Sequence, residues 1–319
     1  MGLRMPELRK DAPKILVMGD SYTEGFGLSN KNTFPAQLEK ALGGQWQVLN
    51  GGVIGFSPAL YSHYLKEKLA TLGAKYVLLN LDFTDLNDDV YYLSNAEYDS
   101  EGNLVGFPNR ELFPSAITNL VYKNKLALLR FAHQEANLWA RSKLQEKNLK
   151  FLEKKVAEPP SLIHQEWLNQ NPDTQNCWKN FELTAKLIQD LKNEVKKMGG
   201  KLAIHMYPPG YFLKTSKRRP QTISFWQKWQ SLKNKNNDFS CGMSFSAEKV
   251  FEKYAVSQGI PFFSSIEFIK NYPNKEKLYF EEDAHWNKDG VKVVTASLAP
   301  KLEKDFLKLS VKQGKRSGQ

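Results

Sequence analysis

Residues with the types and spacing for acyl-ester chemistry lie at two distant places in the sequence. Ser21 follows Gly19 and Asp20 at the end of a short apolar run. A serine held where a buried strand meets a helix is a candidate nucleophile, because the first N–H groups of the helix favour negative charge there. Far downstream, Asp283 and His285 supply a candidate base and the carboxylate that orients it. Together these residues are the groups that acyl transfer through a serine requires.

Ser21 also has a purely structural interpretation. Serine is a frequent N-cap, and the turn from a strand into a helix is where such a cap lies. The nearby Gly19, Gly25 and Gly27 favour the nucleophile, because close approach of the backbone to a substrate uses glycine. The sequence therefore predicts a nucleophilic serine, with a helix cap as the alternative.

Asp283 and His285 are close enough in sequence for a direct contact. In a loop, a carboxylate two residues before an imidazole can accept its N–H, fix its tautomer and stabilise the imidazolium. Trp286 would shield the pair from water. The alternatives are a surface histidine with an incidental neighbour, or Glu281 or Glu282 as the orienting acid.

The segments that must position these residues alternate between strand and helix patterns. Short apolar runs predict buried strands at 14–18, 46–49, 76–81, 201–207 and 261–263. Helical periodicity predicts helices at 33–42, 59–72, 180–198, 247–258 and 291–306. This order predicts a three-layer α/β/α fold around a parallel sheet of about five strands.

Sheets of this kind bind ligands beyond the carboxyl ends of their strands. Three loops rich in glycine or polar residues fall at those ends, at 19–27, 50–57 and 82–89. They predict a common site. In the second loop, the backbone N–H of Gly55 is a candidate donor to an oxyanion, with a glycine-rich turn chosen for shape as the alternative.

The 319 residues are expected to form one domain, 1–319, with a mainly helical insertion at about 90–170. Residues 92–108 are polar and rich in turn formers, with a hairpin turn predicted at 99–102. Residues 120–155 are rich in Lys and Leu and helical in pattern. The insertion interrupts an α/β pattern that resumes after it.

Composition excludes several classes of protein. An apolar content of 41% is ordinary for a globular chain, and no stretch approaches the length of a transmembrane helix. The net charge of +11 is expected to be a solvated surface, with attraction to an anionic glycan or a membrane as the alternative. Basic residues are dispersed and no nucleic-acid motif occurs, so no nucleic acid is expected as a partner.

No cofactor or metal is expected. Cys177 and Cys241 have the spacing of no metal or redox motif. Four aspartates between positions 82 and 89 could suggest a cation site, but such sites need more converging oxygens than a sequence can show. We predict no metal site and a monomer.

Three blocks of the sequence resemble those of the SGNH/GDSL hydrolases. The blocks are 19–25, 50–55 and 283–287, and the resemblance covers 14–90 and 177–300. It implies a flavodoxin-like α/β/α fold, Ser21 as nucleophile, His285 as base and Asp283 as its acid. It also implies Gly55 as an oxyanion donor, beside the N–H of Ser21.

Two finer features are similar to particular members of this family. The spacing of one residue between Asp283 and His285 is similar to the branch that modifies O-acetyl groups of alginate and peptidoglycan. Residues 2–7 resemble a segment of envelope-anchored members. With no signal peptide visible, an upstream anchor would imply a periplasmic or envelope location, and its absence a cytoplasmic one.

One block departs from the family pattern. The family has Gly-x-Asn-Asp after the third strand, with the Asn side chain as an oxyanion donor. Here Thr84 stands in place of that Asn and Asp85 is retained. A threonine hydroxyl donates one hydrogen bond over a shorter reach. Asn87 would take the role if the loop bulges.

These features predict a serine esterase that hydrolyses an acyl ester. The expected acyl group is acetyl, and the expected alcohol is a carbohydrate or an envelope glycan. Asp20, Asp85 and Trp286 are expected to bind the substrate, a small-molecule or glycan ester. The alternatives are an O-acyltransferase with the same triad and a sugar hydroxyl as acceptor, and a glycan-binding module without turnover.

Overall fold

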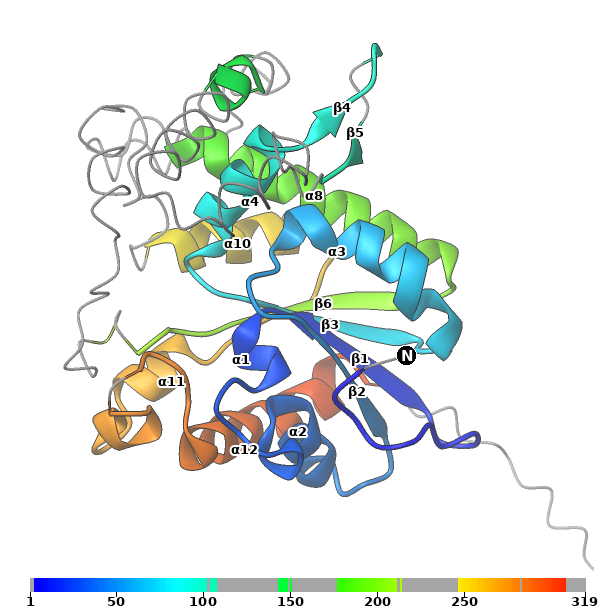
Figure 1. The fold of residues 1–319 in the computed structure, drawn as a ribbon. Coiled ribbons are helices and arrows are strands. Elements are labelled where there is room, and N and C mark those ends of the chain that lie inside the picture. Colours follow the sequence, from blue (N-terminus) through cyan, green and yellow to red (C-terminus); the bar gives the residue numbers. More distant parts are fainter. Residues whose placement is uncertain are drawn as a thin grey trace, which may run out of the picture.

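A computed structural model of the chain shows a parallel sheet between two layers of helices (Figure 1). It describes residues 3–101, 104–107, 143–148, 150, 177–210, 213, 246–281 and 283–307. The five strands lie in the order β2-β1-β3-β6-β7, all parallel. The prediction of an α/β/α fold with about five parallel strands is confirmed.

The bounds of the strands agree closely with the predicted runs. The sheet is made of β1 Lys14–Gly19, β2 Gln47–Gly52, β3 Tyr76–Leu81, β6 Lys201–Met206 and β7 Phe262–Ser264. An antiparallel hairpin is formed by β4 Glu97–Tyr98 and β5 Leu104–Gly106, around the turn predicted at 99–102.

The longer helices, with the turns that continue them, cover the sheet. They are α2 Phe34–Ala41, α3 Pro58–Tyr64, α4 Asp85–Ser94, α8 Cys177–Lys197, α10 Ser246–Ser257 and α12 Lys288–Asp305. The shorter ones are α1 Ser21–Glu24, η1 Asn30–Asn32, η2 Leu65–Leu69, η3 Ala70–Leu72, α11 Ile266–Lys270 and η5 Lys275–Leu278.

Alternate residues of β1 face the two layers. Leu16 and Met18 pack into the core under α3, α8 and α10, whereas Ile15 and Val17 pack into the core under α2 and α12. All four side chains are fully buried. A strand buried on both faces therefore appears in the sequence as a continuous apolar run.

The predicted helix at 59–72 changes geometry along its length. It begins as α3, widens into a π-helical turn at Leu65–Leu69 and ends as a 3₁₀ turn at Ala70–Leu72. Leu65 and Leu69 stay fully buried through the wide turn. Gly73, with φ of 73°, ends the segment in the left-handed conformation that glycine favours.

Helix α4 continues the core beyond residue 90. Leu86 and Leu93 are buried, and α4 packs against α3 and α8. Most of the predicted insertion lies outside the described residues, so the insertion and the single domain stay predictions. Among the helices that the structure describes, none is long and apolar enough to span a bilayer.

A buried carboxylate joins three helices on the upper layer of Figure 1. Asp89 of α4 accepts hydrogen bonds from Ser57 Oγ at 2.6 Å, Ala59 N at 2.8 Å and Thr184 Oγ1 at 2.6 Å. Ser57 and Ala59 lie at the start of α3, where backbone N–H groups favour an anion, and Thr184 lies on α8. Asp89 therefore anchors the helix that follows the third loop of the site.

Replacing Asp89 with Ala should destabilise the fold by about 3 kcal/mol or more, because three buried donors would lose their acceptor. Asp89→Asn keeps one acceptor oxygen and should cost less. Urea denaturation of both variants measures the difference. An Asp89→Ala midpoint equal to that of the unchanged protein would contradict this role.

Candidate active site

Ser21 lies at the start of α1, directly after the carboxyl end of β1. The N-cap of α1 is Asp20, whose Oδ1 accepts from Tyr22 N at 2.9 Å. The capping role that was the alternative for Ser21 is therefore filled by its neighbour. The Ser21 hydroxyl instead lies 2.7 Å from His285 Nε2, across 264 positions of sequence.

The residues after β7 and η5 bring His285 and Asp283 to Ser21. Asp283 Oδ1 is hydrogen-bonded to His285 Nδ1 and also accepts from His285 N at 2.8 Å. With the Nδ1 proton held by this carboxylate, Nε2 is left to accept the Ser21 proton. Asp283 is thus the acid that contacts the imidazole. Glu281 is exposed, and Glu282 lies outside the described residues.

The backbone N–H groups on either side of Gly55 are hydrogen-bonded within the loop after β2 or to its neighbours. Val53 N donates to Gly19 O at 3.0 Å, Ile54 N to Glu24 Oε2 at 2.7 Å, and Phe56 N to Val53 O at 3.0 Å. Within the described part of the chain, the N–H of Gly55 has no acceptor. Gly55 has φ of 74°, which favours glycine. Its N–H has the freedom that an oxyanion donor needs.

Close packing around the nucleophile also requires glycine at the ends of both strands. A Cβ on Gly19 would lie 2.2 Å from Thr23 Oγ1, and one on Gly52 would lie 2.3 Å from Glu24 N. The end of β2 can therefore approach α1 only because Gly52 has no side chain. This approach brings the Gly55 loop against α1, where Ile54 N donates to Glu24 Oε2.

The third loop differs from the expectation. Thr84 donates from both its backbone N and its hydroxyl to Asp82 Oδ1, each at 2.6 Å. The one hydroxyl proton of Thr84 is therefore bound to Asp82 and does not point to a substrate. Asn87 lies in the first turn of α4, which begins at Asp85. A role for Asn87 as oxyanion donor stays a prediction.

Three residues expected to bind the substrate lie around or beneath the triad. Asp85 and Trp286 are only 4% and 2% exposed, and Asp85 Oδ2 accepts from Asp82 N at 2.8 Å. We assign both to supporting the site rather than touching a ligand. Asp20 is half-buried, and its Oδ1 also accepts from Tyr207 Oη at 2.9 Å.

Several aspartates crowd this edge of the sheet, and burial makes their charge costly. Burial and then the charge of Asp82 raise the pKa of Asp20 to about 7. Burial and then the charges of Asp82 and Asp89 raise the pKa of Asp88 to about 7. Burial also raises the pKa of Asp82, against hydrogen bonds from Thr84 and the nearby His285 ring, which lower it.

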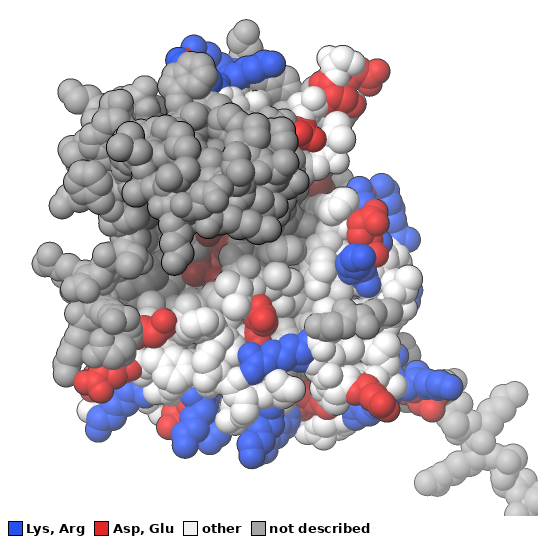
Figure 2. Space-filling model, in the orientation of Figure 1, with Lys and Arg blue, Asp and Glu red and all other residues white. Residues whose placement is uncertain are grey.

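These carboxylates form no metal site within the described ranges, where no group of three or more His, Cys, Asp or Glu side chains could hold an ion. On the face shown in Figure 2, basic side chains lie mainly along the lower and right margins, while acidic ones appear in the hollow left of centre. Among the residues that the structure describes, carboxylates rather than basic side chains are visible in that hollow.

Sequence reasoning missed several residues that shape the site. Phe26 is 45% exposed and its ring lies 4.9 Å from that of His285. Ile54, beside Gly55, is 54% exposed. The Tyr92 hydroxyl donates to Gly55 O. Phe26 and Ile54 fall within the two glycine-rich loops, which was the one available signal for them. Tyr92 is one of the aromatic residues of the expected insertion, which could either stack on a sugar or form a core.

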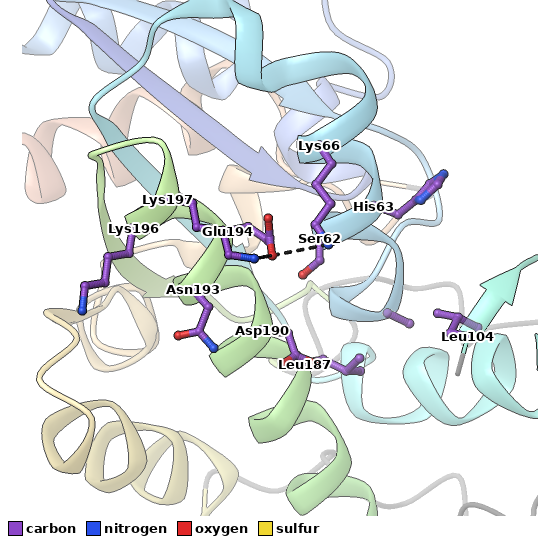
Figure 3. A pocket seen from close by; sticks show the side chains of 11 residues that line it. Ser62, His63, Lys66, Leu104, Leu187, Asp190, Asn193, Glu194, Lys196 and Lys197 are labelled. Atoms are coloured by element: carbon purple, nitrogen blue, oxygen red, sulfur yellow. Dashed lines mark hydrogen bonds and ion pairs between the residues drawn. The ribbon is translucent and has the colours of Figure 1, made fainter. Parts of the chain in front are cut away.

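A groove of about 820 Å³ lies elsewhere, between α3 and α8 (Figure 3). Lys66 and Lys197 both pair with Glu194, at 3.3 and 2.8 Å. The groove is lined by neither Ser21 nor His285. It is therefore separate from the triad.

No protein-family model matches this chain, and a search of curated proteins gave no match. Solved structures with some similarity include a psychrotrophic esterase from Pseudoalteromonas sp., at 11% identity and a TM-score of 0.43, covering 91% of this chain and 96% of that one. A GDSL-like lipase from Bacteroides thetaiotaomicron has 13% identity and a TM-score of 0.42, covering 94% and 92%. A lipase/acylhydrolase from Enterococcus faecalis has 10% identity and a TM-score of 0.42, covering 92% and 96%. Because the identities and TM-scores of these structures are low, the functional proposal rests on the geometry of this chain.

The raised pKa of Asp88 predicts that stability falls as pH rises. An unfolded chain releases this proton near the ordinary value of 3.8, whereas the folded protein holds it up to about 7. The neutral acid therefore favours the folded state below pH 3.8, and this advantage is lost as pH rises through about 7.

Urea midpoints at pH 5 and pH 8 measure this effect. The unchanged protein should be more stable at pH 5, and Asp88→Asn should show a smaller difference between the two pH values. The variant should still be somewhat more stable at pH 5 than at pH 8, because burial also raises the pKa of Asp20 to about 7 and that of Asp89 to about 6. An unaltered pH difference in Asp88→Asn would rule out the assignment.

Proposed function

We propose that this protein is a serine esterase. The observation that carries the proposal is a chain of two hydrogen bonds, from Asp283 to His285 Nδ1 and from His285 Nε2 to Ser21 Oγ. The second of these bonds is 2.7 Å long. In this proposal His285 takes the Ser21 proton as Oγ attacks the ester carbonyl, and then donates it to the leaving alcohol. Water hydrolyses the acyl-enzyme by the reverse proton transfers, and no cofactor takes part.

The developing oxyanion is held by backbone groups. The N–H of Ser21 and the N–H of Gly55 are the two donors in this proposal, from the loops after β1 and β2. Tyr92, which donates to the Gly55 carbonyl, and Glu24, which accepts from Ile54 N, fix the second loop. Donors fixed before reaction stabilise the transition state without reorganisation.

For the substrate we propose an acetyl ester of a carbohydrate. The spacing of Asp283 and His285 resembles that of O-acetyl-modifying proteins, and Phe26 offers an exposed aromatic face next to the imidazole. Aromatic rings present large apolar faces on which other rings can pack. Hydrolysis rates on p-nitrophenyl acetate, butyrate and octanoate measure the preferred acyl length. Mass spectrometry of an added sugar shows whether the acyl group is transferred to it, which separates an acyltransferase from a hydrolase.

Removing the nucleophile should abolish activity. Ser21→Ala should lower p-nitrophenyl acetate turnover to the uncatalysed background, because it removes the hydroxyl that forms the acyl-enzyme in this proposal. Ser62→Ala is the matched control, since Ser62 lies on α3 in the separate groove and its hydroxyl has no partner in the described structure. Equal rates for Ser21→Ala and the unchanged protein would refute the esterase.

Thr84→Asn should raise kcat by about tenfold to a hundredfold. An amide at this position would add a third oxyanion donor, and losing one such donor elsewhere lowers kcat about 10²–10³-fold. Thr84→Val should change kcat by less than about threefold, because the Thr84 hydroxyl is bonded to Asp82. A much larger loss in Thr84→Val would show instead that this hydroxyl serves the oxyanion. Steady-state kinetics on p-nitrophenyl acetate provide the measurement.

A further inference from the structure

We propose that Tyr22 is the positioning residue that holds the Asp283–His285 loop against the nucleophile. The proposal rests on the proposed esterase function. Tyr22 follows Ser21 directly in the chain, and its hydroxyl donates to the carbonyl of Ala284, the residue between the acid and the base. One residue therefore connects the nucleophile's turn to the loop that carries the other two members of the triad.

The backbone of Tyr22 is fixed on the nucleophile's side. Its N–H donates to Asp20 Oδ1 at 2.9 Å, as the cap of α1 requires. The same Asp20 oxygen accepts from the Tyr207 hydroxyl at 2.9 Å. Because Tyr22 and Ser21 are adjacent, the position of Tyr22 is set by the same cap that sets Ser21.

The ring of Tyr22 is held independently of its hydroxyl. It is 5% exposed and lies 4.9 Å from the Tyr207 ring and 5.0 Å from the Trp286 ring. It also lies 4.5 Å from the imidazole of His285, tilted by 34°. A phenylalanine would keep these ring contacts and lose the hydroxyl that bonds to Ala284.

The loop itself has a second support. The Ala284 carbonyl also accepts from Gly210 N at 2.9 Å. Loss of the Tyr22 hydroxyl therefore leaves the loop attached, but free to shift relative to Ser21. A displacement of about 1 Å between reacting groups can cost about a hundredfold in rate, so a partial loss of restraint should be visible in kcat.

Tyr254→Phe is the matched control. The Tyr254 hydroxyl donates to a backbone carbonyl, that of Ala185 on α8, at 2.6 Å, so the substitution makes the same chemical change away from the triad. It should cost a similar amount of stability, which thermal denaturation measures, without altering the triad. Comparing the two variants separates positioning from a general loss of stability.

Kinetics provide the first readout. Tyr22→Phe should lower kcat for p-nitrophenyl acetate, and the rate at which a fluorophosphonate labels Ser21, by about tenfold each, with KM within about twofold. Tyr254→Phe should leave both rates unchanged. Equal rates for Tyr22→Phe and the unchanged protein, or equal losses in the two variants, would overturn the proposal.

Proton NMR provides a readout that does not depend on turnover. The downfield resonance of His285 Nδ1–H, identified by its absence in His285→Gln, should exchange with water faster in Tyr22→Phe than in Tyr254→Phe or the unchanged protein. Equal exchange in all three would overturn the positioning role even if esterase activity is present. Faster exchange in a protein that neither hydrolyses esters nor labels at Ser21 would support the restraint and refute the esterase.

Discussion

The parallel pairing of β1 with both β2 and β3 is the constraint on which the site depends. Gly19 pairs with Gly52, and Met18 pairs with Leu79, so three carboxyl ends meet at one edge of the sheet. The loops that leave these ends must then share the same space. In this way residues far apart in the sequence are brought around one position in front of the nucleophile. Replacing Gly52 would push the end of β2 away from α1 and separate two of those loops.

The fold was largely predictable because its signals are local. Strands buried on both faces appear as apolar runs, and the helices between them carry a 3.6-residue period, so the α/β order follows from short stretches. The grouping of Ser21, Asp283 and His285 could also be predicted. Loops at strand ends converge by topology, and the spacing of the last two residues lets the carboxylate reach the ring. The wide turn at Leu65–Leu69 carried no comparable local signal.

What could not be predicted is the direction in which polar groups point. Thr84 has the capacity to donate one hydrogen bond, and the sequence alone leaves open whether an oxyanion or Asp82 receives it; the structure places it on Asp82. The same holds for the helix cap, which either Asp20 or Ser21 could have supplied. Asp85 and Trp286 have the chemistry to bind a substrate, yet their depth in the core depends on packing between distant segments. Residue type sets what a group can do, and tertiary contacts decide what it does.

In the proposed reaction Ser21 attacks an ester, and the backbone N–H groups of Ser21 and Gly55 hold the resulting oxyanion. A crystal structure of the protein after reaction with a fluorophosphonate tests it most directly, since the tetrahedral phosphonate mimics the intermediate. We expect a covalent adduct on Ser21 Oγ, with its phosphoryl oxygen about 2.7–3.1 Å from the backbone nitrogens of both Ser21 and Gly55. An adduct on another residue, or a phosphoryl oxygen turned away from Gly55, would contradict it.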